Sequence, residues 1–134
     1  MPITVELLPD EPIIVTTMRE PINYTEETPP MFTQMIELRD KELAGKFNKY
    51  YVIIDMQGIK PSFSEIVFSL NEARKTGANR LPNLSMTLNL VGSGDLFEMV
   101  ANALGQTQYG EHKAPLQPTL EKALEAIRAD IKAS

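Results

Sequence analysis

The hydrophobic and polar positions of this 134-residue chain change period several times, and each change predicts a different element. Apolar and polar residues alternate over most of Ile3–Leu8, and Ile13–Met18 is rich in β-branched residues, which is typical of two strands. Pro9–Pro12 separates them, and so short a turn-rich link predicts a hairpin. The polar stretch Arg19–Met31 then holds three prolines and three acids, and we expect it to be a long surface loop.

Apolar positions recur at the spacing of an α-helix in four later parts of the chain. The first of these helices is expected to have Thr28 as its N-cap and Pro29 at its first helical position. Each helix is bounded by a capping side chain, a glycine or both. The four expected ranges are 28–45, 62–77, 95–105 and 119–131.

Three further strands are expected between these helices. Tyr50–Ile54 is an apolar run without polar alternation, which indicates a central strand covered on both faces. Met86–Leu90 alternates, as a half-buried strand does, and His112–Leu116 would add a short edge strand. The order is therefore β-β-α-β-α-β-α-(β)-α. It predicts a single α/β domain over residues 1–134, with a mixed, mostly parallel sheet and an N-terminal hairpin.

Composition narrows the class of protein. A hydrophobic share of 43% and a charged share of 23% are typical of a soluble globular chain. No apolar run approaches the roughly 18 residues of a membrane span, and Met1–Glu6 lacks the pattern of a secretory signal. The absence of cysteine excludes disulfides, thiolate chemistry and cysteine-ligated zinc. We therefore expect a cytoplasmic protein, and an exported mature chain without cysteine is the alternative.

The charge balance bears on the partner. Eighteen acids against 13 Lys and Arg give a formal net charge of −5, and the basic residues are scattered. Binding to nucleic acid depends largely on basic side chains that neutralise phosphates, so nucleic acid is not expected as a partner. The basic surface of another protein would match this charge better.

The polar residues after the Tyr50–Ile54 run are the main candidates for a site. Asp55 ends that strand, Gly58 lies in the following turn, and such a position is a common ligand site in α/β proteins. The simpler interpretation is that Asp55 caps amides of the turn. Ser62 and Glu65 have the spacing of a capping box, and capping explains this helix start better than a functional role for the nearby Ser64.

The second candidate is the Gly92–Asp95 turn between a strand and a helix. Gly92 and Ser93 could present backbone amides to an anion, but the turn lacks the length and the lysine of a phosphate-binding loop. A tight turn capped by Ser93 or Asp95 explains it better. His112 is the only histidine, and the sequence offers neither a base–nucleophile pair nor a metal-ligand set. No cofactor, metal or catalytic residue is expected.

Three segments together resemble the STAS fold of anti-sigma factor antagonists, in its SpoIIAA-like branch. Val52–Ile59 is similar to the strand of that family that runs into an Asp and a polar-Gly pair. Ser62–Lys75 resembles its following amphipathic helix, and Ala114–Ile127 resembles its closing strand and Thr-Leu-Glu helix start. The resemblance covers most of the chain from Tyr50 onward.

This resemblance implies a bacterial-type regulatory domain that is not an enzyme and acts by binding another protein. The family's phosphoacceptor serine would correspond to Ser64. Its motif there is Asp-Ser-Ser/Thr-Gly, whereas this chain has Phe63, Ser64, Glu65 and Ile66. The resemblance therefore implies the interaction without the usual phosphoserine switch. The expected contact face comprises Asp55, Gly58, Ser62, Ser64, Glu65, Gly92 and Ser93.

Other functions stay open at this point. One alternative is a carrier or sensor of a small apolar, lipid-like ligand, held in a methionine- and aromatic-lined pocket between the sheet and the first helix. An enzyme that uses Asp55, Ser64 or His112 is the weakest alternative. The hairpin edge and the amphipathic last helix would also suit a homodimer. Tyr24, Phe32, Phe47 and Tyr109 are expected to form an exposed apolar patch.

Overall fold

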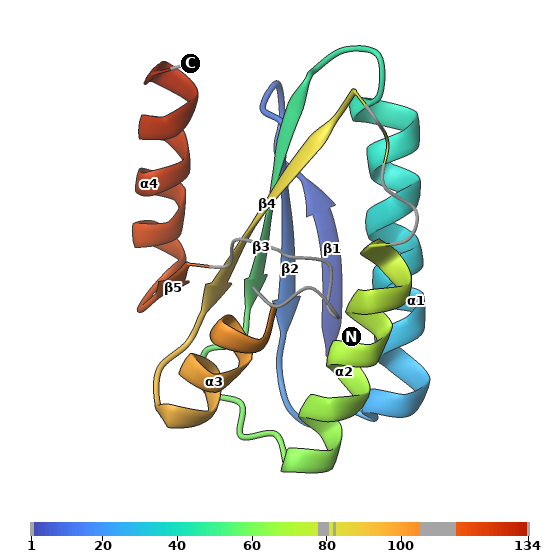
Figure 1. Ribbon diagram of the computed structural model, residues 1–134, viewed down its shortest axis with the longest axis vertical. Coiled ribbons are helices and arrows are strands. Elements are labelled where there is room, and N and C mark those ends of the chain that lie inside the picture. The colour runs from blue at the N-terminus through green and yellow to red at the C-terminus, as the bar shows by residue number, and fades with distance from the viewer. Residues whose placement is uncertain (1, 78–80, 82, 105–114, 134) are drawn as a thin grey trace.

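A computed structural model describes residues 2–77, 81, 83–104 and 115–133 of the chain. Four α-helices and one π-helical turn surround a five-stranded sheet in this part of the chain (Figure 1). The strands are β1 (Ile3–Leu7), β2 (Ile13–Met18), β3 (Lys49–Asp55), β4 (Ser85–Val91) and β5 (Leu116–Gln117). The helices are α1 (Tyr24–Leu38), η1 (Arg39–Leu43), α2 (Phe63–Gly77), α3 (Asp95–Leu104) and α4 (Leu120–Ala133).

The strands lie in the sheet in the order in which they occur along the chain, β1-β2-β3-β4-β5. β1 pairs with β2 in antiparallel orientation, and β2, β3, β4 and β5 pair in parallel. In the register, Ile53 lies between Val15 of β2 and Asn89 of β4. The expected element order, the mixed sheet and the N-terminal hairpin are therefore confirmed.

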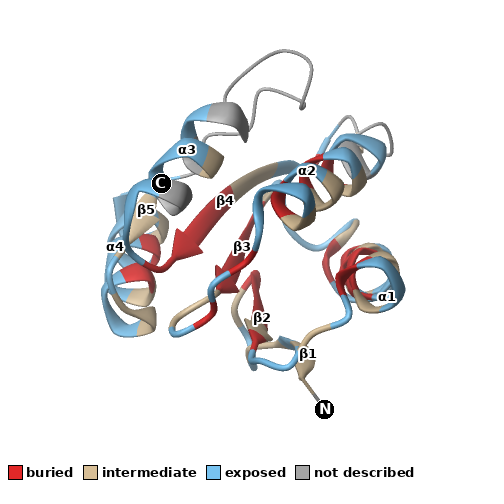
Figure 2. Cartoon of the chain, turned by 90° about the horizontal axis from the view of Figure 1, so that it is seen from below, coloured by how far each residue is buried: buried red, intermediate tan, exposed pale blue. Residues whose placement is uncertain are grey.

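Helices cover both faces of the sheet (Figures 1 and 2). α1 and α2 lie on one face, and α4 lies on the other. Successive side chains of a strand point to opposite faces, so Val52 packs toward α1 and α2 while Ile53 packs toward α4. This double cover explains why β2 and β3 have apolar runs without polar alternation.

Helix α1 begins earlier than the sequence pattern predicts. The expected loop over Arg19–Met31 is wrong in its second half, because the helix starts at Tyr24 and contains Pro29 and Pro30. Asn23 is the cap: its side chain accepts a hydrogen bond from the Glu26 amide at 3.3 Å. The two prolines lie in the second turn, so the carbonyls that lose a donor belong to the exposed first turn, where water can replace it.

The remaining boundaries differ by small amounts. Gly45 (φ 84°) follows the π-helical turn that ends α1, so the predicted stop is confirmed. A short edge strand is present at Leu116–Gln117, whereas residues 112–114 of the expected His112–Leu116 strand, and Gly105, lie outside the described residues. Within the described part of the chain, no helix has both the length and the apolar character needed to cross a membrane.

Candidate functional site

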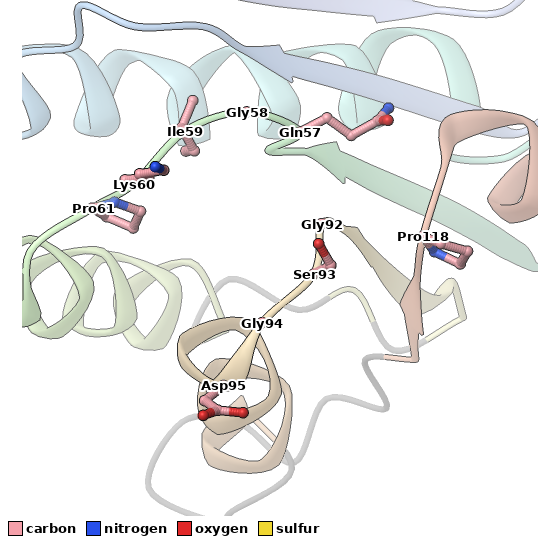
Figure 3. Close-up of a pocket in the computed structure, with 10 residues that line it drawn as sticks. All are labelled: Gln57, Gly58, Ile59, Lys60, Pro61, Gly92, Ser93, Gly94, Asp95 and Pro118. Carbon is pink, nitrogen blue, oxygen red and sulfur yellow. The ribbon is translucent and has the colours of Figure 1, made fainter.

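The carboxyl ends of β3, β4 and β5 meet at one edge of the sheet and surround an open hollow of about 530 Å³ (Figure 3). Parallel strands place their following loops at the same edge, which is where α/β proteins commonly bind ligands. The loop after β3 contributes Gln57–Pro61, the turn after β4 contributes Gly92–Asp95, and Pro118 follows β5. Three of the residues that the sequence pattern predicted for the contact face line this hollow: Gly58, Gly92 and Ser93.

Asp55 lies behind this hollow rather than in its lining. Its side chain is only 2% exposed and forms an ion pair with Arg19, whose Nη2 lies 3.1 Å from Oδ2. The other carboxylate oxygen accepts hydrogen bonds from the Gln57 amide at 3.1 Å and from its side-chain nitrogen at 3.3 Å. The predicted turn cap is confirmed, and the sequence pattern missed the arginine.

Arg19 and Glu20 together hold the loop after β3. Besides its ion pair, Arg19 donates to the carbonyl of Met18 at 2.7 Å, which fixes its guanidinium at the end of β2. Glu20 accepts a hydrogen bond from the Lys60 amide at 2.6 Å. The segment after β2 is therefore joined at two points to the loop that lines the hollow. Gly58, at φ 82°, supplies the left-handed conformation that the loop needs between these points.

The first turn of α2 follows directly after Pro61, which lines the hollow. Ser62 and Glu65 make the predicted capping box: the Ser62 amide donates to Glu65 Oε1 at 2.7 Å, and the Glu65 amide donates to Ser62 Oγ at 3.3 Å. Ser64 is exposed, and its hydroxyl lies 3.2 Å from that of Ser62, within hydrogen-bond distance. The two serines therefore differ: Ser62 is occupied in the cap, and Ser64 is accessible.

The turn after β4 is held mainly by backbone hydrogen bonds. The Gly92 amide donates to the carbonyl of Gln117 at 3.0 Å, which ties the turn to β5. Gly94 has φ 109°, a conformation that favours glycine, and its carbonyl accepts from the Glu98 amide in the first turn of α3. Ser93 and Asp95 are exposed. The geometry agrees with the interpretation of this segment as a tight turn that starts a helix.

An exposed aromatic ring in the first turn of α2 was not predicted. Phe63, the first residue of α2, is 66% exposed, and Val67 one turn later is 37% exposed. The expected apolar patch is wrong for Tyr24 and Phe32, which are both buried in the core beside α1. Phe47 is 37% exposed, and Tyr109 lies outside the described residues.

Tyr24 connects the start of α1 to the same edge of the sheet. Burial, followed by the nearby carboxylates of Glu65 and Glu20, raises the pKa of the Tyr24 phenol to about 12. The first turns of α1 and α2 and the segment after β2 therefore lie close together. The described residues include no group of three His, Cys, Asp or Glu side chains that could hold a metal ion.

No family model, no curated protein and no solved structure matched this chain in the comparisons.

Proposed function

We propose that this chain is a non-enzymatic regulatory domain that binds another protein and resembles anti-sigma factor antagonists of the STAS type. The contact face is the rim of the hollow: the loop after β3, the first turn of α2 and the Gly92–Asp95 turn. The observation that carries this proposal is the exposure of Phe63 in the first turn of α2, two residues after Pro61 of the hollow.

Phe63 has the properties of an interface anchor. It is the most exposed of the large apolar side chains that the structure describes. Burying a phenylalanine side chain contributes roughly 2 kcal/mol, and aromatic residues are enriched in the buried centres of protein interfaces. The exposed serines on either side of it in the sequence, Ser62 and Ser64, suit the hydrated rim of such an interface.

We propose that this binding does not depend on phosphorylation of Ser64. A phosphate there would gain from the positive end of the α2 dipole. It would also lie beside the Glu65 carboxylate, and like charges repel. The Glu65 carboxylate already accepts a hydrogen bond in the helix cap, so it stays near this position. A partner that binds through Phe63 while Ser64 is unmodified needs no such switch.

The test is co-expression with the products of neighbouring genes, followed by co-purification on a tag. We expect a retained partner to be lost with Phe63→Ser and kept with Phe47→Ser. Phe47 is the matched control, because it is an exposed phenylalanine that precedes β3, at the opposite end of the sheet from Phe63. Equal retention by both variants would rule out this face.

A further inference from the structure

The outer edge of β1 is open over the whole length of the strand. β1 and β5 are the two edge strands of the sheet, and β5 has only two residues whereas β1 has five. The carbonyl of Pro2 and the amide of Leu8 are bonded toward β2, and in an antiparallel pair such bonds use every second residue. The intervening residues therefore point their amides and carbonyls outward, where no other element that the structure describes bonds to them: Ile3, Val5 and Leu7.

β1 also lacks the features that usually protect an edge strand. Protected edges are very short, are interrupted by a bulge, or carry proline or lysine. β1 pairs with β2 over five consecutive residues without a bulge, and its sequence contains neither proline nor lysine. The side chains of Ile3, Val5 and Leu7 are half-buried at the margin of the core, and Thr4 and Glu6 on the other face are exposed. A further strand at this edge would cover the half-buried apolar row.

We propose that β1 pairs in antiparallel orientation with β1 of a second copy of this chain, so that the two sheets become one continuous sheet. The strand is complementary to itself in the register centred on Val5. Ile3 then lies opposite Leu7 of the second copy. Thr4 lies opposite Glu6 of the second copy, so no two acids lie opposite each other. This register bonds every outward residue of β1, whereas a register shifted by two residues leaves one of them without an opposite residue in β1.

The structure favours this edge over the other surface that the sequence suggested for a homodimer, the last helix. The large apolar side chains of α4 pack in the cluster on their own face of the sheet: Leu120, Leu124, Ile127 and Ile131. They are therefore already covered within one chain. The two-fold axis of the β1 pair is perpendicular to the sheet, so α1, which packs on the same face as Val5, lies near its own copy and buries further surface (Figure 2).

Net charge opposes this dimer only weakly. Each copy carries a formal charge of −5. Salt at 0.15 M screens charges beyond about 8 Å, whereas the centres of two domains of this size lie about 30 Å apart. Glu6 is the only charged residue of β1, and it lies diagonally from Glu6 of the second copy rather than opposite it. We therefore expect the dimer to tighten by about two- to fivefold between low and high salt.

An introduced pair of cysteines tests the register, because the natural chain has none. Thr4→Cys and Glu6→Cys are made separately in the full chain, mixed in equal amounts and oxidised mildly. In the proposed register the mixed pair is directly opposite, with Cα atoms about 4.5 Å apart, whereas each symmetric pair is diagonal at about 7 to 8 Å, the limit of a disulfide. We expect the mixed disulfide to exceed either symmetric one by about tenfold, against about twofold for random collisions. A ratio near twofold, or an excess of a symmetric product, would overturn the proposal.

Sedimentation of the natural chain tests the dimer itself. We expect a dissociation constant between about 10 µM and 1 mM, because an edge contact is smaller than a standard interface. Val5→Pro removes an outward amide and keeps the bonds to β2, so it should abolish the dimer. Val5→Ala keeps that amide and should weaken the dimer by less than about fivefold. A natural chain that stays monomeric up to about 2 mM, or a folded Val5→Pro variant that still dimerises, would contradict the proposal.

This inference goes beyond the proposed function and does not rest on it. None of the residues of the proposed contact face lies in β1, so the two surfaces are tested by separate variants. We expect Phe63→Ser to release the partner and to keep the dimer. Circular dichroism establishes that each variant is folded, and if Val5→Pro does not fold, the disulfide ratio decides the question alone. Loss of the dimer in folded Phe63→Ser would place the self-contact on α2 and overturn the pairing of β1.

Discussion

The partly buried ion pair between Arg19 and Asp55 should make a measurable contribution to stability and to the shape of the proposed site. The perturbations are Asp55→Asn, Arg19→Met and the two together. Asparagine keeps an oxygen for the Gln57 amide but turns an N–H group toward the guanidinium, so that donor faces donor. Methionine keeps most of the aliphatic stem of Arg19 and removes only its charge and donors.

The expected magnitudes follow from burial. Removing one partner of a fully buried pair costs about 3 to 5 kcal/mol. This pair is only half enclosed, because the Arg19 side chain is 49% exposed while that of Asp55 is 2% exposed. We therefore expect a loss of about 3 kcal/mol for Asp55→Asn and about 2 kcal/mol for Arg19→Met. Because both remove one shared interaction, the double variant should lose about 3.5 kcal/mol, a coupling of about 1.5 kcal/mol.

The assay is urea unfolding of the four proteins, with the coupling energy taken from the double-mutant cycle. The matched control is the cycle for Glu11→Gln and Arg128→Met. Arg128 donates two hydrogen bonds, of 2.9 and 3.0 Å, to the carboxylate of Glu11, but solvent reaches both side chains of that pair. The control should show a smaller coupling that salt weakens more strongly.

The outcome that would contradict this reasoning is a coupling below about 0.3 kcal/mol between Arg19 and Asp55, which is within the error of additive sites. A second readout addresses the loop. The Gln57 amide donates to Asp55, so its hydrogen exchange should accelerate in Asp55→Asn. The two proteins are compared under conditions that give them the same free energy of unfolding. Unchanged protection of this amide there would show that other contacts hold the loop.

Three further results are expected. The pKa of the Tyr24 phenol is raised to about 12, so the stability that the neutral phenol contributes is complete below pH 10 and is lost as the pH rises toward 12. In urea unfolding, the free energy of unfolding of the natural chain should therefore fall by about 2 kcal/mol relative to that of Tyr24→Phe over this pH range, and a pH-independent difference would contradict it. Ser62→Ala should cost about 1 kcal/mol through loss of the α2 cap, and Ser64→Ala less than about 0.5 kcal/mol; equal costs in urea unfolding would refute the assignment of the cap. Asn23→Ala should cost about 1 kcal/mol and speed hydrogen exchange in the first turn of α1, and no change there would show that α1 begins later.

The periodicity of the sequence determined the architecture, because it reports which faces are buried. The strand Ile13–Met18 was predicted with its observed bounds, and the continuous run from Tyr50 indicated the double cover that α2 and α4 provide. The Ser62–Glu65 cap was also determined locally, since both hydrogen bonds join residues three apart. Interactions of this range depend little on the rest of the fold.

The start of α1 shows where local signals conflict. Pro29 and Pro30 indicate a helix start or a loop, and the sequence pattern followed them. The structure instead buries Tyr24 and Thr28, four residues apart on the inner face of the helix. Packing of that turn and the Asn23 cap outweigh the two missing amide donors, and propensity alone does not reveal that balance.

The composition of the site depended on tertiary structure. The sequence placed Asp55 at a strand end, but only the parallel pairing of β2 with β3, with Thr17 opposite Asp55, brings Arg19 from 36 residues away to its carboxylate. Phe63 likewise has the spacing of a core residue, yet it is exposed. Sequence spacing gives the relative angles of side chains around a helix, whereas neighbouring elements decide which of those angles are covered. At the start of α2 they leave the flank of Phe63 open to solvent.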